Sequence, residues 1–138
     1  MENIEGGWLY VKQKLRVPSW MDNMAKTEWK RVRELIDFER FNELDIKALE
    51  AYCQAYSKWK RCEMLLMKEG YTFETPKGYV QQRPEVSISR DAFQSMQSIA
   101  KELGFTPASR IRMSKNEGDG SGGRKSEGYD DEMEGMIS

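Results

Sequence analysis

The sequence of 138 residues contains no histidine and only two cysteines. Histidine is the commonest general base and metal ligand near neutral pH, so its absence removes most nucleophilic triads and most zinc sites. The spacing of Cys53 and Cys62 places them on opposite sides of a helix, where they can neither bridge each other nor share a metal. We therefore predict two buried free thiols in a reducing compartment, and no catalytic residue, metal ligand or cofactor.

Long apolar runs and glycine-rich phosphate loops are missing as well. No stretch approaches the roughly 20 apolar residues that cross a bilayer, and neither GxxxxGKS nor GxxxxGKT occurs. The string GDGSGG at 118–123 fits GxGxxG in letters, but it does not follow the strand-like run that a dinucleotide-binding turn requires. The first residues, MENIEGG, have neither signal-peptide nor transit-peptide character. With 33% charged residues and a mean hydropathy of -0.79, the chain is expected to be a soluble cytoplasmic protein and not an enzyme, with neither a membrane nor a small-molecule substrate as partner.

The longest helical pattern lies between Asn42 and Gly70 and contains no proline and no internal glycine. Asn42 followed by Asp45 is typical of a capping box, and Gly70 suits a left-handed stop, so a helix is expected from about residue 43 to 69. The apolar face of its first turns consists of Ile46, Leu49, Tyr52, Cys53, Tyr56 and Trp59.

The last turns of this helix are apolar on every side, because residues 64–67 point in four directions around the axis. In so short a chain, burial on several sides is most simply supplied by another subunit. We therefore predict a homo-oligomer with Trp59, Leu65 and Leu66 in the interface. A Leu66→Glu change should dissociate the assembly if Leu66 faces a neighbour, and should unfold the monomer if Leu66 faces the subunit's own core.

A preceding helix is expected to follow Pro18, with Ser19 as cap and Asp22 completing a capping box, and to end at about Asp37. Its apolar stripe, interrupted by Glu28, comprises Met21, Met24, Ala25, Trp29, Val32, Leu35 and Ile36. The link FERFN to the central helix is short, so the two helices should pack their apolar faces together as the minimal core.

The other face of this first helix carries what we call the basic ridge: Lys26, Lys30 and Arg33 at i, i+4 and i+7. The preceding arm adds Lys12, Lys14 and Arg16. Between Lys12 and Arg33, seven basic residues stand against two acidic ones. Two interpretations stay open for the ridge, a solvated helix face and a phosphate-contacting surface.

After Gly70 the pattern changes to a period of two across YTFE and YVQQ. The intervening Thr75-Pro76-Lys77-Gly78 suits a β-turn, so a small hairpin is expected here.

Pro84 opens a third helical region, whose clear part runs from Ser89 to Leu103 with Gly104 as C-cap. Its stripe comprises Ile88, Ala92, Met96, Ile99 and Leu103. Its weakly polar outer face includes Gln94 and Gln97, which we add to the predicted oligomer interface. Thr106 followed by Pro107 marks a further helix start.

From about Lys115 the chain is rich in glycine, serine and charge, which predicts a disordered tail. Its end, YDDEMEGMI, interleaves acids with apolar residues and suits either a short recognition element for a partner or a solubilising tail. A second basic cluster, Arg110, Arg112 and Lys115, lies before these acids. The acids would partly cancel the electrostatic field of this cluster.

These patterns together predict a mainly α fold: a helical pair plus a third long helix, a small β-hairpin between the second and third helices, and a disordered C-terminal tail. The expected organisation is an N-terminal arm over residues 1–17, a helical domain over residues 18–114 and an acidic tail over residues 115–138.

Short motifs recur in a definite order: P-S-W at 18–20, A-K-x-x-W at 25–29, Y-C-x-A-Y at 52–56, K-G at 77–78, R-P at 83–84 and L-G-F-T-P-A-S-R at 103–110. In this order they resemble the small subunits of tailed-phage terminases. The resemblance covers about residues 17–113, so the arm and the tail inherit no role from it.

The resemblance implies a non-catalytic protein that assembles into a ring-like oligomer in the cytoplasm of the bacterial host. It further implies that the ring binds double-stranded viral DNA and regulates the ATPase and nuclease of the terminase large subunit. Our DNA-binding candidates are Lys12, Lys14, Arg16, Lys26, Lys30 and Arg33. Two alternatives remain: a helix-turn-helix regulator, which needs a short turn before its recognition helix, and a structural assembly protein without DNA binding.

Overall fold

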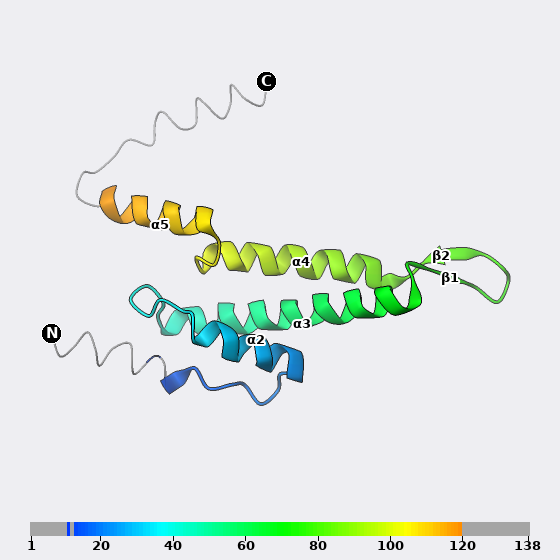
Figure 1. Ribbon diagram of the computed structural model, residues 1–138, viewed down its shortest axis with the longest axis horizontal. Coiled ribbons are helices and arrows are strands. Elements are labelled where there is room, and N and C mark those ends of the chain that lie inside the picture. Colours follow the sequence, from blue (N-terminus) through cyan, green and yellow to red (C-terminus); the bar gives the residue numbers. More distant parts are fainter. Residues whose placement is uncertain (1–10, 12, 120–138) are drawn as a thin grey trace, which may run out of the picture.

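The structure is a computed structural model that describes residue 11 and residues 13–119. In chain order its elements are α2 (Asn23–Arg33), η1 (Glu43–Asp45), α3 (Ile46–Glu69), β1 (Thr72–Glu74), β2 (Val80–Gln82), α4 (Pro84–Glu102) and α5 (Pro107–Asp119). Figure 1 shows α3 and α4 side by side along the molecule, the hairpin at one end, and α2 on the opposite side of α3 from α4. The predicted mainly α fold, with a hairpin between the second and third long helices, is confirmed.

The α3–α4 pair forms the long body of the molecule, because the hairpin reverses the chain between the two helices. The Trp59 ring of α3 lies 5.7 Å from the Phe93 ring of α4, centroid to centroid. Leu66 is buried, and the Ser89 hydroxyl donates a hydrogen bond to the Glu63 carboxylate. The seam between the two helices therefore combines apolar packing with a polar contact that fixes their register.

The first helix begins later than the sequence predicts, because Asp22 is itself the N-cap. Its carboxylate accepts a hydrogen bond of 2.9 Å from the backbone N–H of Ala25. The same carboxylate accepts a hydrogen bond of 2.7 Å from the Ser57 hydroxyl of α3. Ser19, the predicted cap, lies instead in a turn before the helix. The start of α2 is thus marked by a local capping bond, and a tertiary bond from Ser57 of α3 holds the capping carboxylate.

The end of α2 also differs from the prediction, since the helix stops at Arg33 instead of near Asp37. The Leu35 N–H bonds to the Val32 carbonyl at 2.9 Å, a tightened last turn after which the chain leaves the helix axis. Leu35, which the stripe assigned to the core, is consequently 70% exposed.

The buried core lies where α2, α3 and the segment before α2 meet. Trp29, Leu15, Leu49 and Cys53 are fully buried there. The Trp29 indole N–H donates a hydrogen bond of 3.2 Å to the Leu15 carbonyl, so this large ring is packed without losing its polar partner. Both cysteines are buried and free, as predicted.

The hairpin and the helix after it follow the local turn chemistry. The Gly78 N–H bonds to the Thr75 carbonyl at 2.9 Å, and Gly78 has a φ of 88°, which favours glycine. The strands pair antiparallel with Phe73 opposite Gln81. The following helix, α4, begins at Pro84, the residue that was predicted to open the third helical region.

The last described helix, α5, begins as predicted after Thr106, whose hydroxyl accepts a hydrogen bond of 3.2 Å from the Ser109 N–H. It continues to Asp119, past Lys115, where the tail was expected to begin. The rest of the predicted tail lies outside the described residues. Of the helices described, none is long and apolar enough to cross a membrane.

Candidate nucleic-acid and subunit interfaces

The basic ridge lies along one flank of α2. Ala25, Trp29 and Val32 form the buried face of this helix, while Lys30 is exposed and Lys26 and Arg33 are half-buried. Lys30 and Arg33 also belong to the last turn of α2, where cations interact favourably with the helix dipole. The ridge is thus a cationic surface of one helix, held in place by the core behind it.

The arm is attached to the same helix. The Leu15 carbonyl accepts the Trp29 indole N–H, and Trp29 lies one turn from both Lys26 and Arg33. The backbone just before the exposed Arg16 is therefore fixed to the buried face of α2.

The two arm lysines are less available for DNA in the structure than Arg16, or are not described by it. The Lys14 ammonium forms an ion pair of 2.8 Å with Glu43, so part of its charge is compensated within the chain. Lys12 lies outside the described residues. Of the predicted arm cations within the described residues, Arg16 and Lys14 are both exposed, and Lys14 is paired with Glu43.

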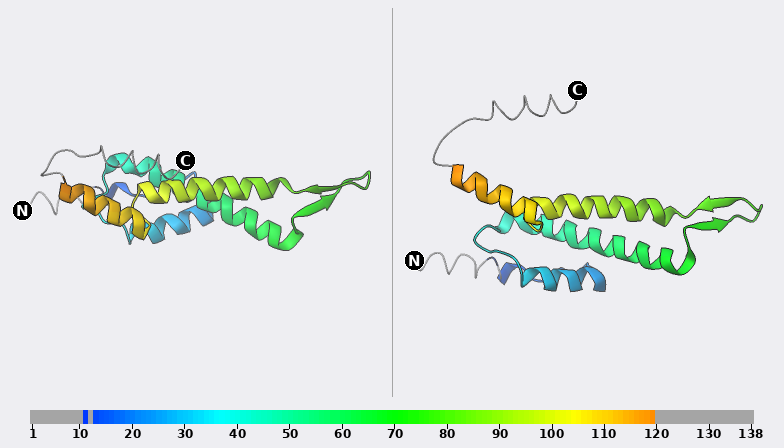
Figure 2. Two further views of the ribbon diagram at one scale, coloured as in Figure 1. Left: turned by 90° about the horizontal axis from the view of Figure 1, so that it is seen from above. Right: turned by 45° about the horizontal axis from the view of Figure 1, so that its top comes forward.

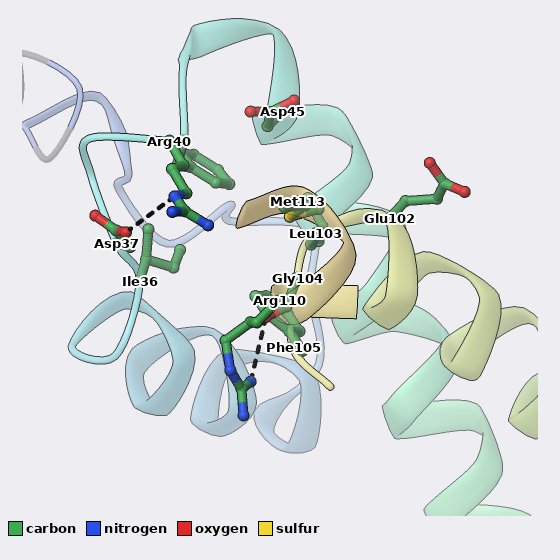
Figure 3. Close-up of a pocket in the computed structure, with 11 residues that line it drawn as sticks. Ile36, Asp37, Arg40, Asp45, Glu102, Leu103, Gly104, Phe105, Arg110 and Met113 are labelled. Carbon is green, nitrogen blue, oxygen red and sulfur yellow. Dashed lines mark hydrogen bonds and ion pairs between the residues drawn. The ribbon is translucent and has the colours of Figure 1, made fainter. Parts of the chain in front are cut away.

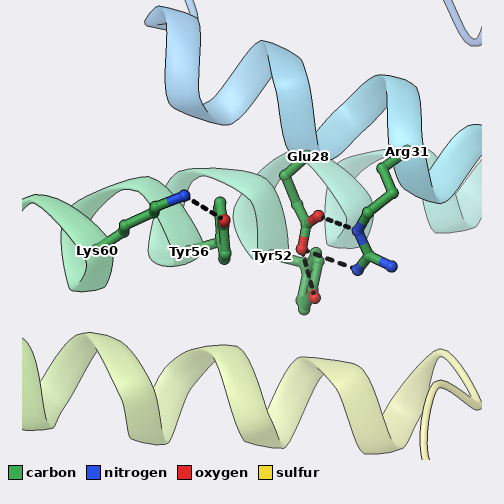
Figure 4. Close-up of polar contacts among 5 residues, drawn as sticks. All are labelled: Glu28, Arg31, Tyr52, Tyr56 and Lys60. Carbon is green, nitrogen blue, oxygen red and sulfur yellow. Dashed lines mark hydrogen bonds and ion pairs between the residues drawn. The ribbon is translucent and has the colours of Figure 1, made fainter.

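A buried polar network joins α2 to α3 on the flank opposite the ridge (Figure 4). Glu28 is only 4% exposed. Its carboxylate accepts a hydrogen bond from the Arg31 guanidinium at 3.1 Å and one from the Tyr52 hydroxyl at 2.9 Å. This explains the interrupted stripe, because the acid inside the apolar face has both a cation and a hydroxyl as partners. The i, i+3 spacing of Glu28 and Arg31 was the available sequence signal, and it was missed.

The network shifts the titration of its neighbours. Burial, together with the charge of Glu28, raises the pKa of Tyr52 above its usual value. Burial raises the pKa of the Cys53 thiol to about 12, with a further contribution from Glu28. Burial alone would raise the pKa of Asp22, but hydrogen bonds from the Ala25 N–H and the Ser57 hydroxyl hold it below its usual value. Asp22 thus remains a charged anchor of α2 at neutral pH.

A comparison with protein families gives a match to the model for the phage terminase small subunit over residues 25–120. The chain belongs to this family. The match contains the whole basic ridge, the hairpin, α4 and α5, and it begins after the arm. Comparisons with curated proteins and with solved structures gave no match.

The residues predicted for the oligomer interface of this small subunit divide into two groups. Leu66 is 4% exposed, and the Trp59 ring contacts the Phe93 ring at a tilt of 46°, so both pack between α3 and α4 of one chain. Leu65, Gln94 and Gln97 are exposed. Within the chain, the first group stabilises the helix pair. The second group, together with the uncovered part of the half-buried Trp59, is open to a neighbouring subunit.

An exposed apolar surface lies on the second half of α3, within the run of residues 64–67 that the sequence predicts to be apolar on every side. Leu49 and Met67 are separated by five helical turns and therefore lie on the same side of the helix. Leu49 is fully buried under α2, whereas Met67, beyond the end of α2, is 85% exposed. Met64 and, just after the helix, Tyr71 are exposed as well. We call Met64, Met67 and Tyr71 the bare seam, because they continue a face that α2 covers earlier.

A small cavity of about 110 Å³ connects the end of α2 with the base of α5 (Figure 3). Its apolar wall includes Ile36 and Met113, and its polar rim includes Arg40, paired with Asp37 at 3.7 Å, and Arg110. The Arg110 guanidinium donates a hydrogen bond of 3.3 Å to the Gly104 carbonyl. Over the described part of the chain, no group of acidic, cysteine or histidine side chains could hold a metal ion.

Proposed function

We propose that this small subunit is the non-catalytic DNA-recognition and regulatory component of a genome-packaging motor in the host cytoplasm. In this proposal it acts as a ring-like oligomer that binds double-stranded viral DNA and stimulates the terminase large subunit. The observation that carries the proposal is the family match over residues 25–120, which contains the complete basic ridge.

The ridge suits phosphate contact better than base reading. Lysine and arginine neutralise phosphates and release counterions, and duplex DNA carries about one charge per 1.7 Å of its axis. Lys26, Lys30 and Arg33 offer no bidentate amide for adenine. Affinity should therefore be mainly electrostatic, with sequence preference arising from DNA shape or from weak contacts summed over subunits.

The bare seam supports the oligomer. Met64, Met67 and Tyr71 expose large apolar groups in a row, and such surfaces commonly mark protein contacts. A ring requires one heterologous contact repeated around the closed assembly. We assign the bare seam, together with the exposed Leu65, Gln94 and Gln97, to that contact.

Two other functions make different demands on the chain. In a helix-turn-helix regulator the recognition helix follows a short turn, whereas residues 34–45, with the η1 turn, separate α2 from α3. A structural assembly protein without DNA binding would keep the oligomer and bind no duplex, so a measurement of duplex binding distinguishes it.

The test replaces Lys26, Lys30 and Arg33 with alanine and measures binding to cognate and random duplexes across a salt series. Binding should weaken on both, and the slope of log affinity against log salt should become shallower by about 0.9 for each phosphate that the variant no longer neutralises. The matched control replaces Lys68, Lys77 and Arg90, at the hairpin end, and removes the same charge. If the control reduces binding as much as the ridge variant, or the ridge variant keeps its slope, this assignment of the DNA site is wrong.

A further inference from the structure

The column of residues that forms the basic ridge starts with an acid. The Lys26 N–H donates a hydrogen bond of 2.9 Å to the Asp22 carbonyl, so Asp22 stands one helical turn before Lys26 on the same side of α2. Lys30 and Arg33 lie further along the same column. A carboxylate at this end of a phosphate-contacting surface repels the ligand unless a cation compensates its charge.

The compensating cation comes from α3. A guanidinium nitrogen of Arg61 lies 3.4 Å from a carboxylate oxygen of Asp22. The Arg61 side chain is 58% exposed and the Asp22 side chain 25%, so the cation faces the solvent more than the acid does. A guanidinium has five N–H donors, and it can hold a carboxylate with some of them while the others bind a phosphate. Arg61 therefore extends the cationic surface of α2 by a contact from another helix.

We propose that Arg61 is a further phosphate contact of the DNA site, placed at the start of the ridge by Asp22. The proposal rests on the DNA-binding role of the ridge. The column from Asp22 to Arg33 rises by roughly 17 Å at about 1.5 Å per residue. Duplex DNA presents roughly ten charges over that length, enough for Arg61 and the cations of the ridge together.

The neighbouring Lys60 carries the same charge on the same helix but lies elsewhere. Its ammonium donates a hydrogen bond of 3.2 Å to the Tyr56 hydroxyl, on the flank where Glu28 and Tyr52 meet (Figure 4). That flank is opposite to the ridge. Lys60 is therefore a matched control for Arg61, since its loss removes the same charge at a different place.

Asp22 limits how strongly Arg61 can attract a phosphate, because it already compensates part of the guanidinium charge. Asparagine caps a helix about as well as aspartate. Its amide oxygen can still accept the hydrogen bonds that the Ala25 N–H and the Ser57 hydroxyl donate to Asp22. Asp22→Asn should therefore free the charge of Arg61 and keep the cap of α2.

The first experiment compares Arg61→Ala with Lys60→Ala in binding to a random duplex across a salt series. In Arg61→Ala the slope of log affinity against log salt should become shallower by about 0.9 for each phosphate that Arg61 no longer neutralises. Lys60→Ala should keep the slope, and so should Arg61→Lys, which keeps the charge. Equal slopes in Arg61→Ala and Lys60→Ala overturn the proposal.

The second experiment is a double-mutant cycle. Asp22→Asn should tighten binding to the same duplex by up to about fivefold, the strength of an exposed ion pair. A chain that also carries Arg61→Ala should lose this gain. Thermal unfolding checks that the cap is kept, and Asp22→Ser, a second neutral cap, repeats the measurement. An equal gain with and without Arg61 overturns the proposal.

The outcomes separate this proposal from the proposed function. If replacing Lys26, Lys30 and Arg33 makes the slope shallower while Arg61→Ala keeps it, the DNA site stands and the role of Arg61 fails. If Arg61→Ala makes the slope shallower while the ridge variant keeps it, the role of Arg61 stands and the assignment of the ridge fails. A chain that binds no duplex at low salt overturns both.

Discussion

The two halves of α3 carry similar apolar residues on one side and bury them very differently. In the first half, Leu49 and Cys53 lie under α2 and are fully buried. In the second half, Met64 and Met67 continue the same side of the helix and are exposed, because α2 starts at Asn23 and reaches no further (Figure 2). The difference teaches that the first half completes its own core, while the second half offers a surface that a neighbouring subunit can cover.

The largest effect is expected from two adjacent residues of the second half. Leu66→Glu should unfold the chain, since it places a charge in the seam between α3 and α4, where Leu66 is 4% exposed. Met67→Glu should leave the fold intact within about 0.5 kcal/mol, because Met67 is 85% exposed. Thermal unfolding checks the fold, and native mass measurement checks the assembly. Met67→Glu should lower the oligomer mass, and an intact oligomer in this variant would remove the bare seam from the interface.

In the first half, the network under α2 can be broken by Glu28→Ala. This change leaves the buried Tyr52 hydroxyl without its acceptor and should cost roughly 1–3 kcal/mol. The loss stays below that of a fully buried ion pair, because Arg31 is 58% exposed and can be hydrated. Urea unfolding measures the difference, with the exposed Glu39→Ala as the control. Equal stabilities of the two variants would show that the network does not anchor α2.

The same half should lose stability in alkali. Tyr52 and Cys53 have raised pKa values in the folded state, that of Cys53 reaching about 12 against the ordinary value of 9.0. Above about pH 9 the unfolded chain releases protons that the folded chain retains, so the free energy of unfolding must fall as pH rises. Urea unfolding between about pH 8 and pH 10.5 should show this decline. The decline should be shallower in Tyr52→Phe, and an unchanged slope would count against the assignment to Tyr52.

The smallest effect on the fold is expected from the C-terminal residues. Deleting residues 120–138 removes none of the described contacts, so stability and the number of subunits in the oligomer should stay unchanged. Stimulation of the large subunit should nevertheless weaken, because an oligomer presents many copies of the tail and gains avidity through them. ATPase assays with the large subunit measure this effect. If the shortened chain stimulates the ATPase of the large subunit fully, the helical part of the chain, and not the tail, contacts the large subunit.

Much of the fold could be predicted from local sequence because local chemistry decides it. The capping box of Asn42 and Asp45 forms with both of its hydrogen bonds present. The turn before Gly78 and the start of α5 after Thr106 also appear where the sequence places them. In each case the partners are only a few residues apart, so the contact forms wherever the rest of the chain lies.

The positions that the sequence misplaced depend on partners far along the chain. Asp22, the cap of α2, is also held by a hydrogen bond from Ser57 of α3, and Leu35 is exposed because the helix ends before it. Leu66 and Met67 are neighbours in an apolar run, and only the direction of α4 decides which of them is buried. By itself the sequence determined the helices, the hairpin and the basic ridge, through periodicity and turn chemistry. The tertiary structure decided which apolar faces are covered, because burial depends on the length and placement of the helix that packs against them.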